Sequence, residues 1–163
     1  MMNTTPTDRI EKLVNLDATR HRVWRALTEV PQFNAWFGCE LTGTFTPGEE
    51  INGIIRFKDT EFKLTLLVKS IEPETLFSFR WHPYAIEPGV DYSHEPTTLV
   101  SFTLEDAGQG GTSLRIVESG FDAIPEARRA KAFSMNSAGW DGQSRNIQKY
   151  LAARASDADT SED

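Results

Sequence analysis

The chain has 163 residues, a net charge of −7 and a sequence pI of about 5.0. This length fits one domain with a substantial core, while the acidic balance disfavours nucleic acid and anionic lipid, which attract clustered basic side chains. No apolar run approaches the roughly 18–20 residues that span a bilayer, and the N-terminus lacks the features of a secretory signal. The single cysteine, Cys39, permits no internal disulfide. We therefore expect a cytoplasmic protein with no membrane span and no nucleic-acid partner.

The first part of the chain predicts one strand followed by two short helices. Residues 9–16 alternate apolar and charged side chains, as in a strand. Asp17 and Thr19 are candidate N-caps for a helix over residues 20–30, whose apolar residues share one face. Pro31 ends that helix or opens a second one, which reaches residue 37 and carries Trp36 and Phe37.

From residue 38 to about 120 the apolar pattern has a period of two, which predicts six or seven strands of an antiparallel sheet with one apolar face. The clearest strands cover residues 51–57, 62–72, 75–82, 97–106 and 112–121. A hairpin loop is expected at residues 58–61. The connection at residues 83–96 is long and contains three prolines, and it is typical of either a functional lid or a loosely ordered segment.

The last predicted element is a long helix that opens at Pro125 and ends near residue 153. Residues 1–8 are expected to be flexible, residues 9–153 to form one domain, and the acidic segment 154–163 to be disordered. An unusual feature of the helix is that hydroxyl and amide side chains accompany Trp140 on the apolar face.

Four phrases in this order resemble the START-like helix-grip superfamily: VWRALTEVPQFNAWF, LVKSIEPETLFSFRW, LRIVESGF and GWDGQSRNIQKYL. The likeness is closest to the activator of heat-shock-protein-90 ATPase homologue-like family, which is related to the polyketide cyclases. The resemblance implies an α+β fold of the START and Bet v-like kind. In this fold a curved antiparallel sheet of six to seven strands wraps around a long C-terminal helix, with two short helices after the first strand. It also implies a cavity between sheet and helix that takes a lipophilic molecule.

The periodicity predicts the same inner wall, and a mostly apolar wall with a few polar groups is typical of small-molecule sites. Asn136 and Ser144 would be polar because they face this cavity. The predicted ligand-binding residues are Trp36, Phe37, Phe57, Leu66, Phe79, Trp81, Phe102, Glu118, Phe133, Asn136, Trp140 and Ser144.

Glu118 allows two interpretations. Strict alternation with Leu114 and Ile116 places it on the inner face, where a buried carboxyl group must be hydrogen-bonded, paired or protonated. Alternatively the strand ends near residue 118 and the carboxylate reaches water at the rim. An inward position would make Glu118 a candidate general acid or base.

Three functions follow from these features. The first is binding of a small hydrophobic or amphipathic ligand, such as a lipid, without metal or cofactor. The second is a cyclase or dehydratase activity that uses Glu118 or a loop tyrosine, Tyr84 or Tyr92, to transfer protons. The third, which the resemblance implies, is stimulation of a chaperone ATPase. His82, His94, Asp91 and Glu95 lack the spacing of metal ligands, and His82 is expected on the outer face. The pattern leaves a monomer and a homodimer both open.

Overall fold

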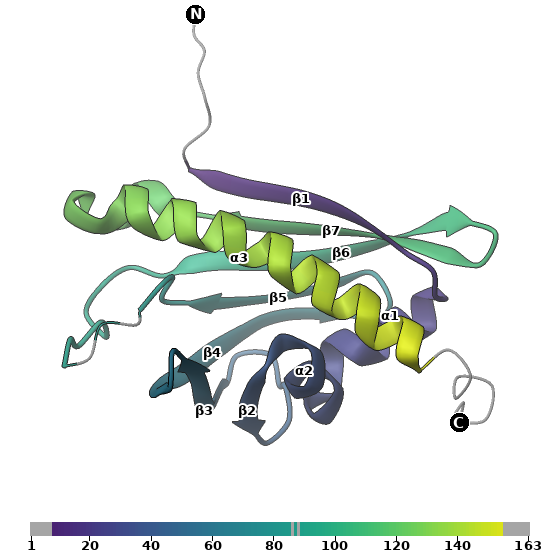
Figure 1. The fold of residues 1–163 in the computed structure, drawn as a ribbon, viewed down its shortest axis with the longest axis horizontal. Coiled ribbons are helices and arrows are strands. Elements are labelled where there is room, and N and C mark those ends of the chain that lie inside the picture. The colour runs from purple at the N-terminus through teal and green to yellow at the C-terminus, as the bar shows by residue number, and fades with distance from the viewer. Residues whose placement is uncertain (1–7, 86, 88, 155–163) are drawn as a thin grey trace, which may run out of the picture.

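The computed structural model describes residues 8–85, 87 and 89–154. Within them a curved seven-stranded antiparallel sheet carries one long helix, α3 (Glu126–Ala153), across its inner face (Figure 1). This arrangement confirms the helix-grip fold. The expectations of a flexible N-terminus and a disordered acidic tail lie outside the described residues, apart from Asp8 and Arg154.

The sheet places the first two strands at its opposite edges, in the order β1-β7-β6-β5-β4-β3-β2. Two short helices, α1 and α2, follow β1 along the chain and lead to β2, so they cross the end of the sheet beneath α3 (Figure 1). The strands are β1 (Arg9–Leu16), β2 (Cys39–Thr42), β3 (Glu50–Phe57), β4 (Thr60–Glu72), β5 (Leu76–Trp81), β6 (Thr98–Gly108) and β7 (Gly111–Ser119).

The helices α1 (Arg20–Thr28) and α2 (Val30–Phe37) form the tight pair that the sequence predicts. Of the two predicted caps, Thr19 is the one that caps α1, by accepting a hydrogen bond from the Arg22 backbone N–H. The indole Nε1 of Trp36 donates to the Ala26 carbonyl oxygen at 2.8 Å, which ties the second helix to the first. Asn34 then fixes α2 against β2, because its side chain both donates to and accepts from the Leu41 backbone.

The core fills the space between the inner face of the sheet and one end of α3. Its fully buried aromatic side chains alternate along β5 and β6, as the period of two requires. These side chains are Phe77, Phe79 and Phe102. Their ring centroids lie 5.8–6.1 Å apart, which is within the range of favourable aromatic packing. The face of α3 that packs on this core includes the buried residues Trp140, Ile147 and Leu151. Phe133, on the same face, is only partly buried and packs on Phe121.

The structure corrects the hairpin predicted at residues 58–61. The turn is shorter, because Lys58 and Asp59 both adopt left-handed backbone conformations, with φ of 51° and 66°, and β4 begins at once at Thr60. Two consecutive residues with positive φ form the kind of tight turn that matches the twist of paired strands.

Unequal strand lengths open the sheet beside this hairpin. β4 has 13 residues but β5 has six, and their pairing begins only at Leu67 and Arg80. Pro83, two residues beyond Trp81, has no N–H with which to continue a ladder. Residues 60–66 of β4 therefore have no partner in β5, and the chain leaves the sheet at this point.

Candidate functional site

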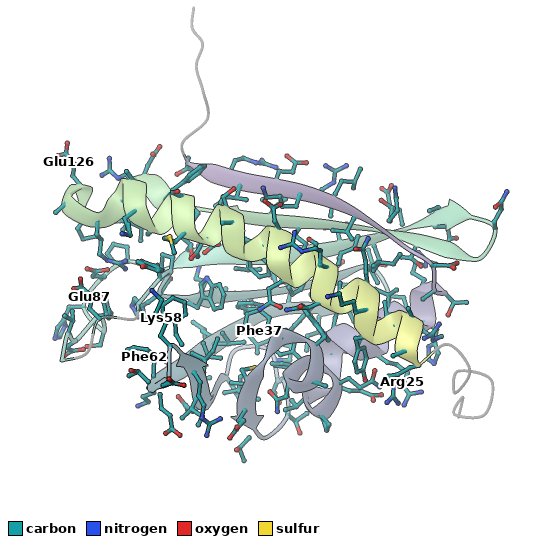
Figure 2. The ribbon with its side chains drawn as sticks, in the orientation of Figure 1. Arg25, Phe37, Lys58, Phe62, Glu87 and Glu126 are labelled. Carbon is teal, nitrogen blue, oxygen red and sulfur yellow. The ribbon has the colours of Figure 1, made fainter. Side chains whose placement is uncertain are left out.

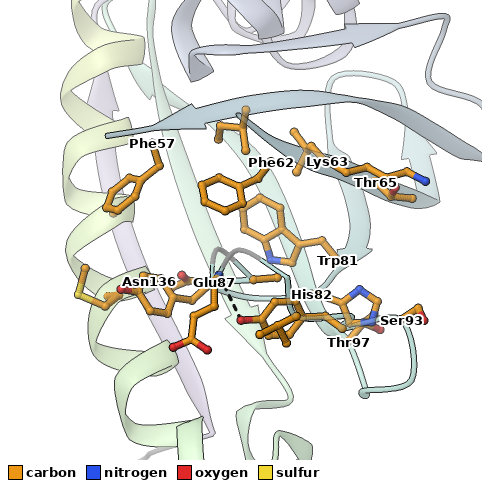
Figure 3. Close-up of a pocket in the computed structure, with 18 of the residues that line it drawn as sticks. Phe57, Phe62, Lys63, Thr65, Trp81, His82, Glu87, Ser93, Thr97 and Asn136 are labelled. Carbon is orange, nitrogen blue, oxygen red and sulfur yellow. Dashed lines mark hydrogen bonds between the residues drawn. The ribbon is translucent and has the colours of Figure 1, made fainter. Parts of the chain in front are cut away.

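A cleft of about 1110 Å³ lies where β5 stops short, and we call it the α3 cleft. It is bordered by α3, by the hairpin of β3 and β4, by the end of β5 and by the described part of the loop that follows (Figure 3). In Figure 2, Phe37, Phe62 and Glu87 come from three segments distant in sequence and lie on the same side of α3. The cleft therefore forms only when the fold brings these segments together.

Aromatic and aliphatic side chains form the inner wall of the cleft. Phe37 comes from α2, Trp81 from β5 and Trp140 from α3, and their ring centroids lie 5.9–6.1 Å from one another. This spacing is direct packing, so the three rings form a continuous wall with no gap between them. The rest of the apolar lining includes Ile55, Phe57, Phe62, Leu64, Tyr84 and Met135.

Five of the twelve predicted ligand-binding residues line the α3 cleft: Phe37, Phe57, Trp81, Asn136 and Trp140. The other seven lie outside this lining: Trp36, Leu66, Phe79, Phe102, Glu118, Phe133 and Ser144. Four of these, Trp36, Leu66, Phe79 and Phe102, belong to the packed core. Ser144, expected to face the cavity, instead donates its hydroxyl hydrogen to the Trp140 carbonyl oxygen one turn earlier, which satisfies it within the helix. Alternation along a strand identifies the inner face, but it does not say where sheet and helix separate.

Glu118 occupies the inner face and is fully buried, which decides between its two interpretations. Its oxygen Oε1 accepts from Trp140 Nε1 at 2.8 Å, and Oε2 accepts from Trp81 Nε1 at 2.7 Å and from Thr98 Oγ1 at 2.6 Å. Asn136 Nδ2 lies 3.0 and 3.1 Å from the two oxygens. A buried carboxylate is tolerated when its acceptor positions are filled in this way.

The Glu118 carboxylate acts on the cleft through its neighbours. Three of its four donors, Trp81, Asn136 and Trp140, line the cleft, although Glu118 does not. Each indole has a single N–H, and here both are directed at the carboxylate. The carboxylate therefore fixes the orientation of two tryptophans of the cleft lining.

The loop between β5 and β6 borders the cleft and is held to α3 by one arginine. Arg128 donates to Glu95 Oε1 through Nη2 at 2.6 Å and through Nε at 2.8 Å, and to the Pro83 carbonyl oxygen at 2.9 Å. Its guanidinium carbon also lies 4.7 Å from the centroid of the Tyr92 ring. Arg128 of α3 therefore holds the loop near its start, at Pro83, and near its end, at Glu95.

Charged side chains, most of them exposed, surround the mouth of the cleft. They include Glu50, Glu61, Lys63, Arg80, Glu87 and Asp91. His82, expected on the outer face, lies among them as a half-buried residue whose Nε2 is 3.0 Å from the Glu95 carbonyl oxygen. Within residues 8–85, 87 and 89–154, no three His, Cys, Asp or Glu side chains group closely enough to hold a metal ion. None of the described helices is both long and apolar enough to cross a membrane.

Sequence reasoning missed several lining residues on α3, among them Met135, Gly139 and Gln143. A glycine inside a long helix lowers the stability of that helix, so its presence usually has a packing or functional reason. Gly139 was therefore the one sequence signal for a helix face that borders open space. A Cβ atom added at Gly139 would meet no other atom within 4 Å. Gln143 donates to the Phe37 carbonyl oxygen and thereby joins α3 to the end of α2.

Comparison with protein families gives one match that covers most of the chain. A family model described as "Activator of Hsp90 ATPase homolog 1-like protein" matches residues 17–152. No curated protein sequence matches the chain.

Several solved structures resemble the chain. DynU16, a protein in the dynemicin biosynthetic locus, has a TM-score of 0.68 and 24% identity, over 90% of this chain and 48% of that chain, so this chain spans about half of DynU16. A Rhodobacter sphaeroides protein has a TM-score of 0.67 and 25% identity, over 94% and 97% of the two chains. The Aha1 dimer from Colwellia psychrerythraea has a TM-score of 0.66 and 17% identity, over 88% and 95%. Such similarity establishes the fold, which hosts more than one function.

Proposed function

The chain belongs to the activator of Hsp90 ATPase homolog 1-like family, and we propose that it binds a small lipophilic or amphipathic molecule in the α3 cleft. The observation that carries this proposal is the cleft itself. Its volume of about 1110 Å³ is slightly above the roughly 300–1,000 Å³ usual for small-molecule sites, and an aromatic wall with a few polar groups is their usual construction. The occurrence of a similar fold in a biosynthetic locus also supports a small-molecule ligand.

Two glycines of α3 allow this proposal to be tested with matched variants. Gly139 lines the cleft, whereas Gly142, three residues later, does not. A Cβ atom at Gly142 would meet only the Arg145 side chain, at 3.9 Å, so both positions accept a larger residue without a backbone clash. Leucine at either position also improves the propensity of the helix, which keeps both variants folded.

The experiment measures the fluorescence of Nile red, a neutral lipophilic dye, as it is titrated with each protein. We expect binding by the wild-type chain and by Gly142→Leu, and at least tenfold weaker binding by Gly139→Leu, whose side chain occupies the cleft. A wild-type chain that leaves the dye unbound, or two variants that bind it equally, would refute a ligand site in the cleft.

A cyclase-like enzyme is the second candidate, and Tyr84 is the observation in its favour. Tyr84 lines the cleft and has a φ of 50°, a left-handed conformation that is uncommon for a bulky residue and that strained functional sites can contain. Glu118 is less suited to proton transfer, because neutral donors already occupy both of its oxygens. This candidate predicts turnover of a polyketide substrate that Tyr84→Phe abolishes while Nile red binding is retained. Turnover at the wild-type rate in that variant would exclude Tyr84 as the proton donor.

The family description also suggests a third activity, stimulation of a chaperone ATPase. It predicts that ATP hydrolysis by the cognate chaperone rises when the chain is added. An unchanged rate across a full titration would exclude it. Ligand binding in the α3 cleft does not depend on this result.

A further inference from the structure

The orientation of the Asn136 side chain is fixed by the chemistry of its partner. Its amide lies against both oxygens of Glu118, at 3.0 and 3.1 Å. A carboxylate only accepts hydrogen bonds, so the NH₂ group of the amide must face it. The amide oxygen Oδ1 is consequently directed away from Glu118.

This oxygen has no partner among the described residues, although the side chain is half-buried and lines the α3 cleft. The other amide that α3 contributes to the lining differs in this respect. Gln143 donates to the Phe37 carbonyl oxygen and accepts from Asn146 Nδ2, so both ends of its amide are occupied. Asn136 therefore presents a fixed and available acceptor beside the aromatic wall.

The acceptor at Asn136 also restricts what the cleft binds beside it. A ligand carboxylate has only acceptor oxygens, so it cannot donate a hydrogen bond to Asn136 Oδ1. Lys63 and Arg80 line the same cleft from β4 and β5, so the discrimination against carboxylates applies to the position beside Asn136.

We infer that the ligand of the α3 cleft is an aromatic or polycyclic molecule that donates a neutral O–H or N–H to Asn136 Oδ1, and that the cleft discriminates against carboxylates at this position. The aromatic ring packs beside Trp81, a half-buried residue of the cleft lining whose own N–H group is already bonded to Glu118. This inference rests on the proposed ligand-binding function and names the chemical class of its ligand.

Three naphthalenes of similar size test the inference by displacing Nile red at neutral pH. 2-Naphthol carries a donor, 2-methoxynaphthalene carries none, and 2-naphthoate carries a negative charge. We expect 2-naphthol to bind about 3- to 10-fold more tightly than its methyl ether, the ratio that one hydrogen bond supplies. We expect 2-naphthoate, which offers only acceptor oxygens, to bind more weakly than 2-naphthol.

Two variants assign the preference to Asn136. Asn136→Leu removes the acceptor and should bring the affinities for 2-naphthol and its methyl ether together. Thr98→Val is the matched control, since it also removes one donor from Glu118 but lies outside the cleft lining, and it should keep the wild-type preference. Both variants are first checked for native circular dichroism.

The outcomes separate this inference from the function on which it rests. Equal wild-type affinities for 2-naphthol and its methyl ether, a preference for 2-naphthoate, or a preference that survives Asn136→Leu would overturn the inference while leaving ligand binding intact. Failure of all three compounds to displace bound Nile red would also overturn the inference alone, whereas a wild-type chain that binds no Nile red would defeat the ligand-binding proposal as well.

Discussion

Trp140 Nε1 donates a hydrogen bond of 2.8 Å to Glu118 Oε1, and this bond joins the long helix to β7 at the inner edge of the α3 cleft. Both residues are buried, with Glu118 at 0% and Trp140 at 2% relative exposure. Trp140 is one of four residues that donate to the same carboxylate, so helix and sheet are connected by a polar cluster inside an apolar core. In such a cluster each member depends on the others for its partner.

Glu118→Gln should destabilise the fold even though the change is nearly isosteric. Glutamine has one oxygen acceptor, and its NH₂ group would face donors such as Trp81, Trp140 or Thr98. Each buried donor left without an acceptor costs roughly 1–3 kcal/mol. Urea unfolding monitored by tryptophan fluorescence measures the loss, with Thr98→Val as the control that removes one donor and strands no other. A glutamine variant as stable as the wild-type chain would show that the cluster does not hold the fold.

Trp140→Ala should lower the free energy of unfolding by roughly 3–5 kcal/mol, the usual cost of truncating a large buried aromatic residue. The ring is 2% exposed and packs 5.9 Å from both Trp81 and Phe102, measured between centroids, so truncation removes these contacts. Trp140→Phe keeps a ring but loses the N–H, and should cost less. If both variants unfold at the wild-type urea concentration, the packing does not contribute as described.

Alanine at Gly53 and at Gly139 should have opposite effects on stability. A Cβ atom at Gly53 would lie 2.0 Å from the Glu40 carbonyl oxygen in the neighbouring strand β2, so the backbone must move, at a cost of about 1–3 kcal/mol or more. At Gly139 the added Cβ meets open space, and alanine should stabilise the helix by about 0.5–1 kcal/mol. Thermal unfolding of the two variants gives the sign directly, and a stabilised Gly53→Ala would contradict the close strand approach.

Arg128→Ala should loosen the loop that borders the cleft without removing any residue of the cleft lining. The substitution deletes the contacts of the guanidinium with Glu95, Pro83 and Tyr92. The free energy of local opening of the loop then falls, and the dissociation rate of Nile red in stopped-flow experiments should rise about 5- to 10-fold. Arg129→Ala is the neighbouring control, because Arg129 bonds the Ile124 carbonyl oxygen at the start of the helix. Equal rates in the two variants would argue against Arg128 as the anchor.

Cys39 should resist alkylation in the folded chain. Burial raises the pKa of its thiol to about 12, and the Sγ–H donates to Asn34 Oδ1. The reactive species is the thiolate, so iodoacetamide at pH 8 should modify the chain only after urea is added. Mass spectrometry of the two samples decides this, and rapid native labelling would contradict the burial.

The same shift in pKa predicts an alkaline loss of stability. The unfolded thiol ionises near its ordinary pKa of about 8.5, whereas the folded thiol retains its proton to about pH 12. Between these values the folded state binds more protons, so the free energy of unfolding falls as pH rises. Cys39→Ala removes this contribution, and its stability should decline less than that of the wild-type chain between pH 9 and pH 11.

How far sequence reasoning reached can be seen at Glu118 and Ser144. Alternation with Leu114 and Ile116 correctly allowed an inward position for Glu118, because a strand turns successive side chains to opposite faces. It left open whether water reached the carboxyl group, since that depends on Trp81, Asn136 and Trp140 arriving from other elements. For Ser144, helical spacing predicted the face, but the hydroxyl found its partner within its own helix.

The amino-acid sequence by itself determined the order of elements, the apolar face of the sheet and the buried stripe of α3, because these follow from local periods of two and 3.6 residues. Only the tertiary structure decided the length mismatch between β4 and β5, the position of the α3 cleft beside it, and the set of donors around Glu118. These features arise where side chains from distant segments meet, and contacts between distant segments leave no periodic signal in the chain.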